Sequence, residues 1–183
     1  LGLVYVSTDP PTIDYYGGFH PGANLFSTTM LALDAETGER RWHFQTVHHD
    51  IWNYDNPAQP ALIDVTIDGQ PRKIVAQTTK QSFVYVLDRV TGEPIWPIEE
   101  RAVPQTDVPG EWTSPTQPFP TKPAAYEMQG LTEDMLIDYT PELRAEALEI
   151  TSKYRLGPLF NPPALADANG VGTSIHCPGA NGG

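Results

Sequence analysis

Apolar and polar residues alternate in short segments along the first half of the chain. A period of two is the pattern of a β-strand with one buried face. Seven strands are predicted on this basis, at 3–7, 28–34, 39–46, 61–67, 72–78, 82–88 and 93–96. The pair Asp68-Gly69 between two of them predicts a type I′ hairpin turn. The pattern therefore indicates an all-β fold built of hairpins.

A sequence repeat groups these strands into two units. The segment 32–42 (ALDAETGERRW) recurs as 86–96 (VLDRVTGEPIW) with Asp, Thr, Gly and Trp in register. In each copy a strand enters an Asp-x-x-Thr-Gly turn, where Asp can cap backbone N–H groups and Gly can adopt a positive φ. Repeated four-stranded sheets of this kind are the blades of a β-propeller, which bury their faces only against neighbouring blades. We expect an incomplete blade, lacking its first strand, in 1–46 and a complete blade in 60–97.

The second half of the chain has a different character. Prolines recur between 97 and 123, which predicts an extended segment without regular strands. Thr140 suits the N-cap of a helix and Pro141 its first position, and a shorter helical turn is expected at 132–137. We interpret 98–160 as a proline-rich and helical insertion, and 161–183 as a loop leading to the next blade.

Composition and charge exclude several classes of function. The 19 prolines and 15 glycines suit a β-protein with many turns. The net charge of −12 disfavours nucleic-acid binding, because a phosphate-binding surface needs clustered Lys and Arg. A single cysteine, Cys177, forms no internal disulfide and makes a structural zinc site improbable. No apolar stretch approaches the roughly 20 residues of a membrane helix, so membrane association is expected only through parts of an intact protein outside this fragment.

Three loops should share one face of the blades. In an up-and-down sheet, the connection between the second and third strands emerges on the same face as the connection to the next blade. These connections are the first loop (8–27), the second loop (47–60) and the third loop (79–81). The first two are far longer than ordinary hairpin connections, and long loops on a rigid scaffold are where sites are built.

Candidate chemistry is concentrated in the second loop. It contains the consecutive residues His48, His49 and Asp50, which could bind a metal. Adjacent side chains rarely point the same way, however, so a structural hydrogen-bonded pair of His49 and Asp50 is the favoured interpretation. Asp9, Lys80 and the segment 49–55 are expected on one face, near the inner edge of two adjacent blades.

The blade motif followed by WHFQTVHHDIW (42–52) resembles the PQQ-dependent (quinoprotein) dehydrogenases, nearest the membrane-bound glucose dehydrogenase type. The resemblance continues through QTTK (77–80), the second blade motif and SPTQPF (114–119), and covers most of residues 1–160. It implies that the chain is an internal fragment, about two blades, of an eight-bladed quinoprotein propeller. That propeller would use pyrroloquinoline quinone (PQQ) and calcium or magnesium.

The resemblance also implies a reaction and a location. A small-molecule sugar or alcohol hydroxyl would be oxidised to the carbonyl, and the electrons would pass to a quinone or cytochrome acceptor. The expected location is the periplasm, with a possible inner-membrane anchor in the full-length protein. The alternative interpretation is a non-catalytic scaffold propeller of quinoprotein-like fold, which would not be expected to keep both Asp9 and Lys80.

Individual positions carry the roles that the resemblance implies. The general base of the family is an Asp, and its position is occupied by Asn53. An amide cannot take a proton from a hydroxyl, so Asp55 or Asp50 would have to be the base, or the enzyme would be weakened or inactive. Lys80 matches a basic residue that lies against the quinone oxygens. Asp9 matches an Asn that binds the metal, and its carboxylate is an equally suitable ligand for a hard cation.

Overall fold

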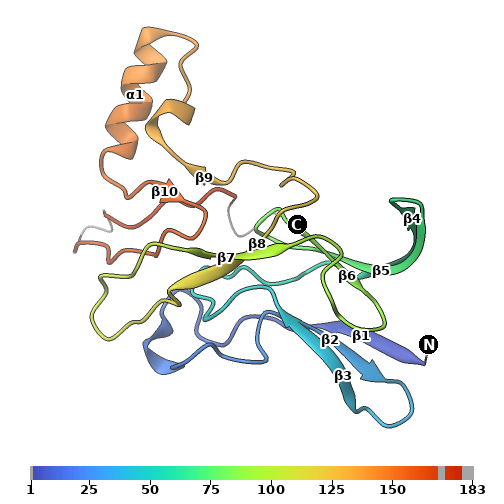
Figure 1. Cartoon of the computed structure of the whole chain (residues 1–183). Coiled ribbons are helices and arrows are strands. Elements are labelled where there is room, and N and C mark those ends of the chain that lie inside the picture. Colours follow the sequence, from blue (N-terminus) through green and yellow to red (C-terminus); the bar gives the residue numbers. More distant parts are fainter. Residues whose placement is uncertain (1, 169–171, 179–183) are drawn as a thin grey trace.

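A computed structural model describes residues 2–168 and 172–178, and antiparallel strands dominate it (Figure 1). The first sheet has the order β1-β2-β3, with strands β1 (Leu3–Ser7), β2 (Thr29–Asp34) and β3 (Arg40–Gln45). The second has the order β4-β5-β6, with strands β4 (Ala61–Ile67), β5 (Gln70–Thr78) and β6 (Val84–Asp88). Six of the seven predicted strands are therefore confirmed.

The repeated turn has the predicted structure in both units. Asp34 Oδ1 accepts hydrogen bonds from the backbone N–H groups two and three residues later, both at 3.0 Å. Asp88 Oδ1 accepts the equivalent bonds at 2.8 and 3.0 Å. Gly38 and Gly92 complete the two turns with φ values of 75° and 79°. A polar side chain and a glycine thus define each hairpin locally.

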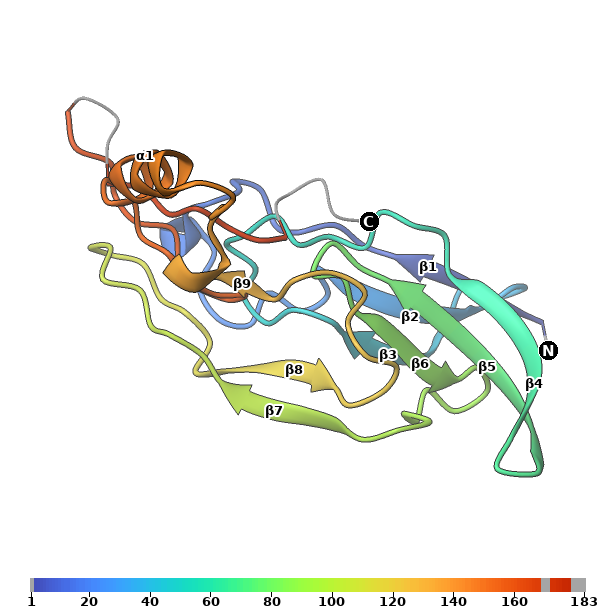
Figure 2. The same cartoon turned by 90° about the horizontal axis from the view of Figure 1, so that it is seen from above.

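Trp42 joins the first sheet to the turn of the second. A Cβ added at Gly92 would lie 2.7 Å from the Trp42 ring, so the ring packs directly on the glycine backbone. The indole N–H donates to the carbonyl of Arg89 at 3.3 Å, and the Tyr5 hydroxyl donates to the same oxygen at 2.6 Å. The residues buried together between the sheets are Met30, Ala32, Trp42, Val75 and Leu87. The two sheets therefore pack side by side (Figure 2).

The prediction of a fourth strand at 93–96 is wrong. This segment forms an isolated bridge between Leu87 and Pro94. The Ile95 N–H also donates to the Val86 carbonyl at 3.0 Å. Proline has no N–H to donate to a ladder, and Pro94 stands at the middle of the predicted strand. The unit in 60–97 therefore has three strands rather than four.

The prediction that 97–123 lacks regular strands is also wrong. Strands β7 (Ile98–Ala102) and β8 (Thr116–Pro120) form an antiparallel ribbon. The Val103 N–H donates to the Pro115 carbonyl and the Thr121 N–H to the Pro97 carbonyl, which places the hydrogen-bonded pairs at odd-numbered residues. Pro118 and Pro120 occupy the alternate positions, where no N–H is needed, and the ribbon tolerates them.

The insertion contains the predicted helix, α1 (Pro141–Thr151), which begins where Thr140 Oγ1 accepts from the Leu143 N–H at 3.3 Å. The 3-10 turn η2 (Glu133–Met135) lies within the predicted 132–137. Strands β9 (Gly130–Leu131) and β10 (Gly157–Pro158) pair below the helix, and Figures 1 and 2 place α1 far from β4. Within the described residues, no helix is both long and apolar enough to cross a membrane. Of the loop expected at 161–183, residues 169–171 and 179–183 lie outside the described residues.

In the full-length protein, Gly92→Ala should destabilise the fold more than Gly69→Ala. Both glycines have positive φ, 79° and 73°, so both variants carry a backbone penalty of about 1–2 kcal/mol. A Cβ at Gly69 would meet no described atom within 4 Å, whereas at Gly92 overpacking against Trp42 should add about 1–3 kcal/mol. Urea unfolding of the two variants measures the difference, and equal losses would contradict the packing of Trp42 on this turn.

Candidate functional site

The first, second and third loops meet at one end of the two sheets. In the first loop, the Ala23 carbonyl accepts from the His49 N–H of the second loop at 3.1 Å. In the third loop, the Lys80 N–H donates to the carbonyl of Asp55 at 3.4 Å, and Gln81 Nε2 donates to the carbonyl of Tyr54 at 3.3 Å. The second loop is therefore held between the other two, as the strand arrangement predicts.

Large side chains of the second loop point into the core. Trp52 and Tyr54 are buried, and their polar atoms donate to the carbonyls of Asn161 at 2.8 Å and Leu159 at 3.0 Å. The residues packed around them are Val47, Ile51, Phe83, Tyr85, Leu159 and Phe160. Asn53 and Asp55 alternate with these buried residues and are partly exposed. The loop thus has an apolar underside and a polar upper surface.

Asp50 stabilises the loop from within. Its carboxylate accepts hydrogen bonds from the Trp52 N–H at 2.8 Å, the Tyr54 N–H at 2.9 Å and Thr28 Oγ1 at 3.2 Å. Complete burial raises the pKa of Asp50 to about 6, although these three bonds act in the opposite direction. Both carboxylate oxygens are therefore occupied by the loop itself.

The expected pair of His49 and Asp50 is not formed. His49 has a positive φ of 49°, and its Nδ1 donates to the Gly22 carbonyl at 2.6 Å, away from Asp50. His48 turns in another direction and places Nε2 3.0 Å from Glu100 of β7. Among residues 2–168 and 172–178, no group of three or more His, Cys, Asp or Glu side chains could hold a metal. His49 thus binds the first loop, and His48 contacts β7.

The polar upper surface of the second loop carries Asn53 and Asp55. Lys80 and Asp55 form an ion pair whose side chains are only 15% and 14% exposed. Asn53 lies two residues before Asp55 and has a φ of 59°. Its Nδ2 donates to the hydroxyl of Tyr15 at 3.5 Å. The second loop therefore carries an amide and, two residues later, a carboxylate that is paired with a cation.

Asp9 lies at the start of the first loop. Its carbonyl accepts from the Thr28 N–H at 3.0 Å, and Thr28 Oγ1 in turn reaches Asp50. The Asp9 side chain is exposed. The Asp9 carboxylate has no hydrogen-bond partner among the described residues.

Sequence reasoning missed the residues that fix the first loop. A Cβ added at Gly17 would lie 2.2 Å from His49 Nε2, and the Gly17 N–H donates to Glu111 Oε1 at 2.8 Å. The Trp112 ring packs edge-on against His49, with centroids 4.8 Å apart. Tyr15 reaches Asn53 as a result. The pair Gly17-Gly18 was the only local signal of this close backbone approach.

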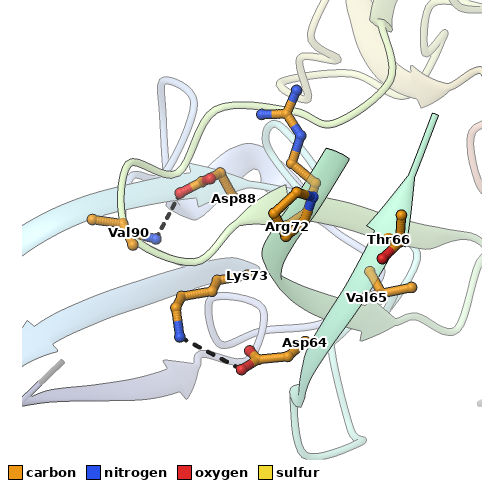
Figure 3. A pocket seen from close by; sticks show the side chains of 8 residues that line it. Asp64, Val65, Thr66, Arg72, Lys73, Asp88 and Val90 are labelled. Atoms are coloured by element: carbon orange, nitrogen blue, oxygen red, sulfur yellow. Dashed lines mark hydrogen bonds and ion pairs between the residues drawn. The ribbon is translucent and has the colours of Figure 1, made fainter. Parts of the chain in front are cut away.

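A polar hollow lies on the second sheet, at the end opposite to the three loops (Figure 3). Asp64 pairs there with Lys73 at 3.5 Å and with Arg89 at 2.6 Å. Asp88 caps its own turn through the Val90 N–H. These charges serve the hairpins of the second sheet and do not approach the three loops.

Comparisons with known proteins give a consistent result. Residues 1–183 match the family model described as PQQ glucose/ethanol/alcohol dehydrogenase, beta-propeller domain. The chain is 40% identical, over all of its length and 24% of the relative's, to the glycerol dehydrogenase large subunit of Gluconobacter oxydans. It is 42% identical to the quinoprotein glucose dehydrogenase of Escherichia coli over 65% of this chain and 15% of that protein.

One solved structure supports the fold. A europium-containing methanol dehydrogenase superposes with a TM-score of 0.50 at 24% identity, over 71% of this chain and 23% of that chain. The chain thus spans about a quarter, or less, of the proteins it matches.

The buried Asp50 should give the stability of the full-length protein a defined pH dependence. Because its pKa is raised from 3.8 to about 6, the native state favours the protonated acid, and this contribution is lost as pH rises from about 4 through about 6. Relative to Asp50→Asn, the wild type should lose about 3 kcal/mol of unfolding free energy between pH 4 and pH 7. Urea titrations of both proteins across this range measure it. Parallel pH profiles would contradict the raised pKa.

Proposed function

Because this chain belongs to the PQQ-dependent glucose/ethanol/alcohol dehydrogenase β-propeller family, we propose that the full-length protein oxidises a sugar or alcohol hydroxyl to a carbonyl. The first, second and third loops would form part of its PQQ site. The observation that carries this proposal is the largely buried ion pair of Lys80 and Asp55, two residues along the second loop from Asn53. A scaffold that only docks proteins has no need of such a pair among its loops.

The residues present fit the cofactor. An ammonium group has three N–H donors, and the pairing of Lys80 with one carboxylate leaves donors for the oxygens of a quinone. Asp9 offers a free carboxylate oxygen, the ligand type that calcium and magnesium prefer. Because no group of three or more His, Cys, Asp or Glu among the described residues could hold a metal, Asp9 would supply one ligand of a metal shell completed by other parts of the full-length protein. Lys80, Asn53 and Asp9 are therefore the residues proposed to contact cofactor and metal.

PQQ, when bound, would accept the two electrons that leave the carbinol carbon as hydride. The remaining work falls to side chains of the chain. Asn53 can hold a substrate hydroxyl by a hydrogen bond, and Asp55 can accept the proton of the hydroxyl that is oxidised, as general base. Lys80 fixes the position of Asp55 and supplies a cation near the negative charge that develops during oxidation. Asp50 does not suit the base role, because its oxygens are occupied and buried.

The electron acceptor and the location belong to the same proposal. Family membership supports a quinone or cytochrome acceptor and a periplasmic protein, with any membrane anchor outside this fragment. The direct test is to supply the full-length protein with PQQ and calcium and to follow reduction of an artificial dye with sugars or alcohols. Substrate-dependent dye reduction is expected, and its absence with bound PQQ would favour the scaffold propeller.

Exchanging the two polar residues on the loop should separate their roles. Asp55→Asn should lower turnover by about 10²- to 10⁴-fold, the usual worth of general-base assistance. Asn53→Asp should raise turnover or leave it similar, since it adds a second carboxylate. Steady-state dye reduction measures both. An enzyme indifferent to Asp55→Asn would exclude Asp55 as the base, and activity restored only by Asn53→Asp would show that the natural protein has lost its chemistry.

Removing the free carboxylate should affect metal-dependent cofactor binding. Asp9→Ala should weaken PQQ binding at limiting calcium, because the metal shell loses one charge and one ligand. The matched control is Glu146→Ala, an exposed acidic residue on α1. PQQ affinity is followed by fluorescence quenching over a calcium titration. Identical titrations for Asp9→Ala and the wild type would exclude Asp9 as a ligand.

A further inference from the structure

The first loop presents Tyr15 to the candidate site on a fixed backbone. Two residues later, Gly17 is held between His49 and Glu111, with its N–H bound to Glu111 Oε1 at 2.8 Å. The adjacent Tyr16 hydroxyl donates to the carbonyl of Pro109 at 3.3 Å. The loop is therefore attached on both sides immediately after Tyr15. The position of Tyr15 over the second loop follows from these attachments.

Tyr15 and Asn53 face one another in uncommon backbone conformations. Their φ values are 67° and 59°, a region that residues other than glycine adopt rarely and often at functional sites. Asn53 Nδ2 lies 3.5 Å from the Tyr15 hydroxyl. The Tyr15 side chain remains 50% exposed. The phenol is thus directed at Asn53 while part of it stays accessible to a ligand.

The direction of this hydrogen bond determines what the pair can bind. Because the Tyr15 oxygen accepts from the Asn53 amide, its own O–H proton is free to be donated. Asn53 Oδ1 accepts no hydrogen bond from any residue in 2–168 or 172–178, so it is free as an acceptor. One donor and one acceptor therefore lie side by side, two residues along the second loop from the Asp55 that pairs with Lys80.

We propose that Tyr15 is a specificity-determining residue that, together with Asn53, binds the second hydroxyl group of a vicinal diol, next to the hydroxyl that is oxidised. One substrate hydroxyl gives its proton to Asp55 and is the one oxidised, while its neighbour donates to Asn53 Oδ1 and accepts from the Tyr15 hydroxyl. A monohydric alcohol makes only the first of these contacts. The inference rests on the proposed dehydrogenase function and adds the substrate class that this site selects.

The test compares Tyr15→Phe with the wild type in the full-length protein loaded with PQQ and calcium. The substrates are 1,2-propanediol and 1-propanol, and the control is Tyr139→Phe, whose side chain is 85% exposed in the insertion. Loss of one neutral hydrogen bond should lower kcat/KM for the diol by about 2- to 10-fold, mainly through KM. The kcat/KM of Tyr15→Phe for 1-propanol and its affinity for PQQ should equal those of the wild type. Tyr139→Phe should match the wild type in every measurement.

Two outcomes would overturn the role of Tyr15. One is an unchanged kcat/KM for the diol, and the other is an equal fall for both alcohols, which would indicate a general structural effect. If the wild type reduces no dye with either alcohol, the proposed function has failed. In that case, the affinity of the PQQ-loaded protein for 1,2-propanediol, measured by calorimetry, tests the role of Tyr15 independently of turnover. Weaker binding by Tyr15→Phe supports it, and equal or undetectable binding in the two proteins overturns it.

Discussion

The packing of Trp42 on the backbone of Gly92 is the contact on which the rest of the structure depends. A three-stranded sheet cannot bury both of its faces alone, and this indole connects the first sheet to the turn of the second. Only a glycine leaves room for the ring at that point. Once the two sheets are held side by side, the ends of their strands coincide, and the three loops at those ends must meet. The local chemistry of a repeated turn thereby determines where the candidate site lies.

The second loop presents the polar side chains of the candidate site on this scaffold. Trp52 and Tyr54 anchor it in the core, and Asp50 binds its backbone from inside, so that Asn53 and Asp55 are left on the outer side. The β7–β8 ribbon reinforces the other end, because Gln117 binds both the N–H and the carbonyl of His48, at 2.8 and 2.7 Å. A loop supported at so many points can hold an amide and a carboxylate in fixed positions, which general-base catalysis requires.

Local sequence patterns predicted the parts of the fold that depend on near neighbours. Six of the strands, the Asp-x-x-Thr-Gly turns and the start of α1 at Thr140 each follow from a few adjacent residues and are observed. The fourth strand failed because Pro94 interrupts a ladder that the repeat suggested. The β7–β8 ribbon was missed because proline is compatible with strands at alternate positions, and only the register reveals which positions those are.

In the candidate site, too, some features could be predicted from the sequence and others depend on contacts between distant residues. Family resemblance led to Asn53, Asp55 and Lys80, and the structure pairs Lys80 with Asp55, two residues after Asn53. The expected pairing of His49 with Asp50 failed, since the positive φ of His49 turns its ring towards the first loop. Tyr15 carries no signal in the sequence. Its place beside Asn53 depends on contacts between loops far apart in the chain, which residue patterns do not encode.

The central claim is that the three loops form one side of a PQQ site. A structure of the full-length protein with PQQ and calcium bound tests it most directly. The account predicts that the quinone lies against the second and third loops, with Lys80 in hydrogen-bond contact with its oxygens, and that the metal lies beside Asp9. A quinone bound elsewhere, with no contact to Lys80 or Asn53, would contradict it.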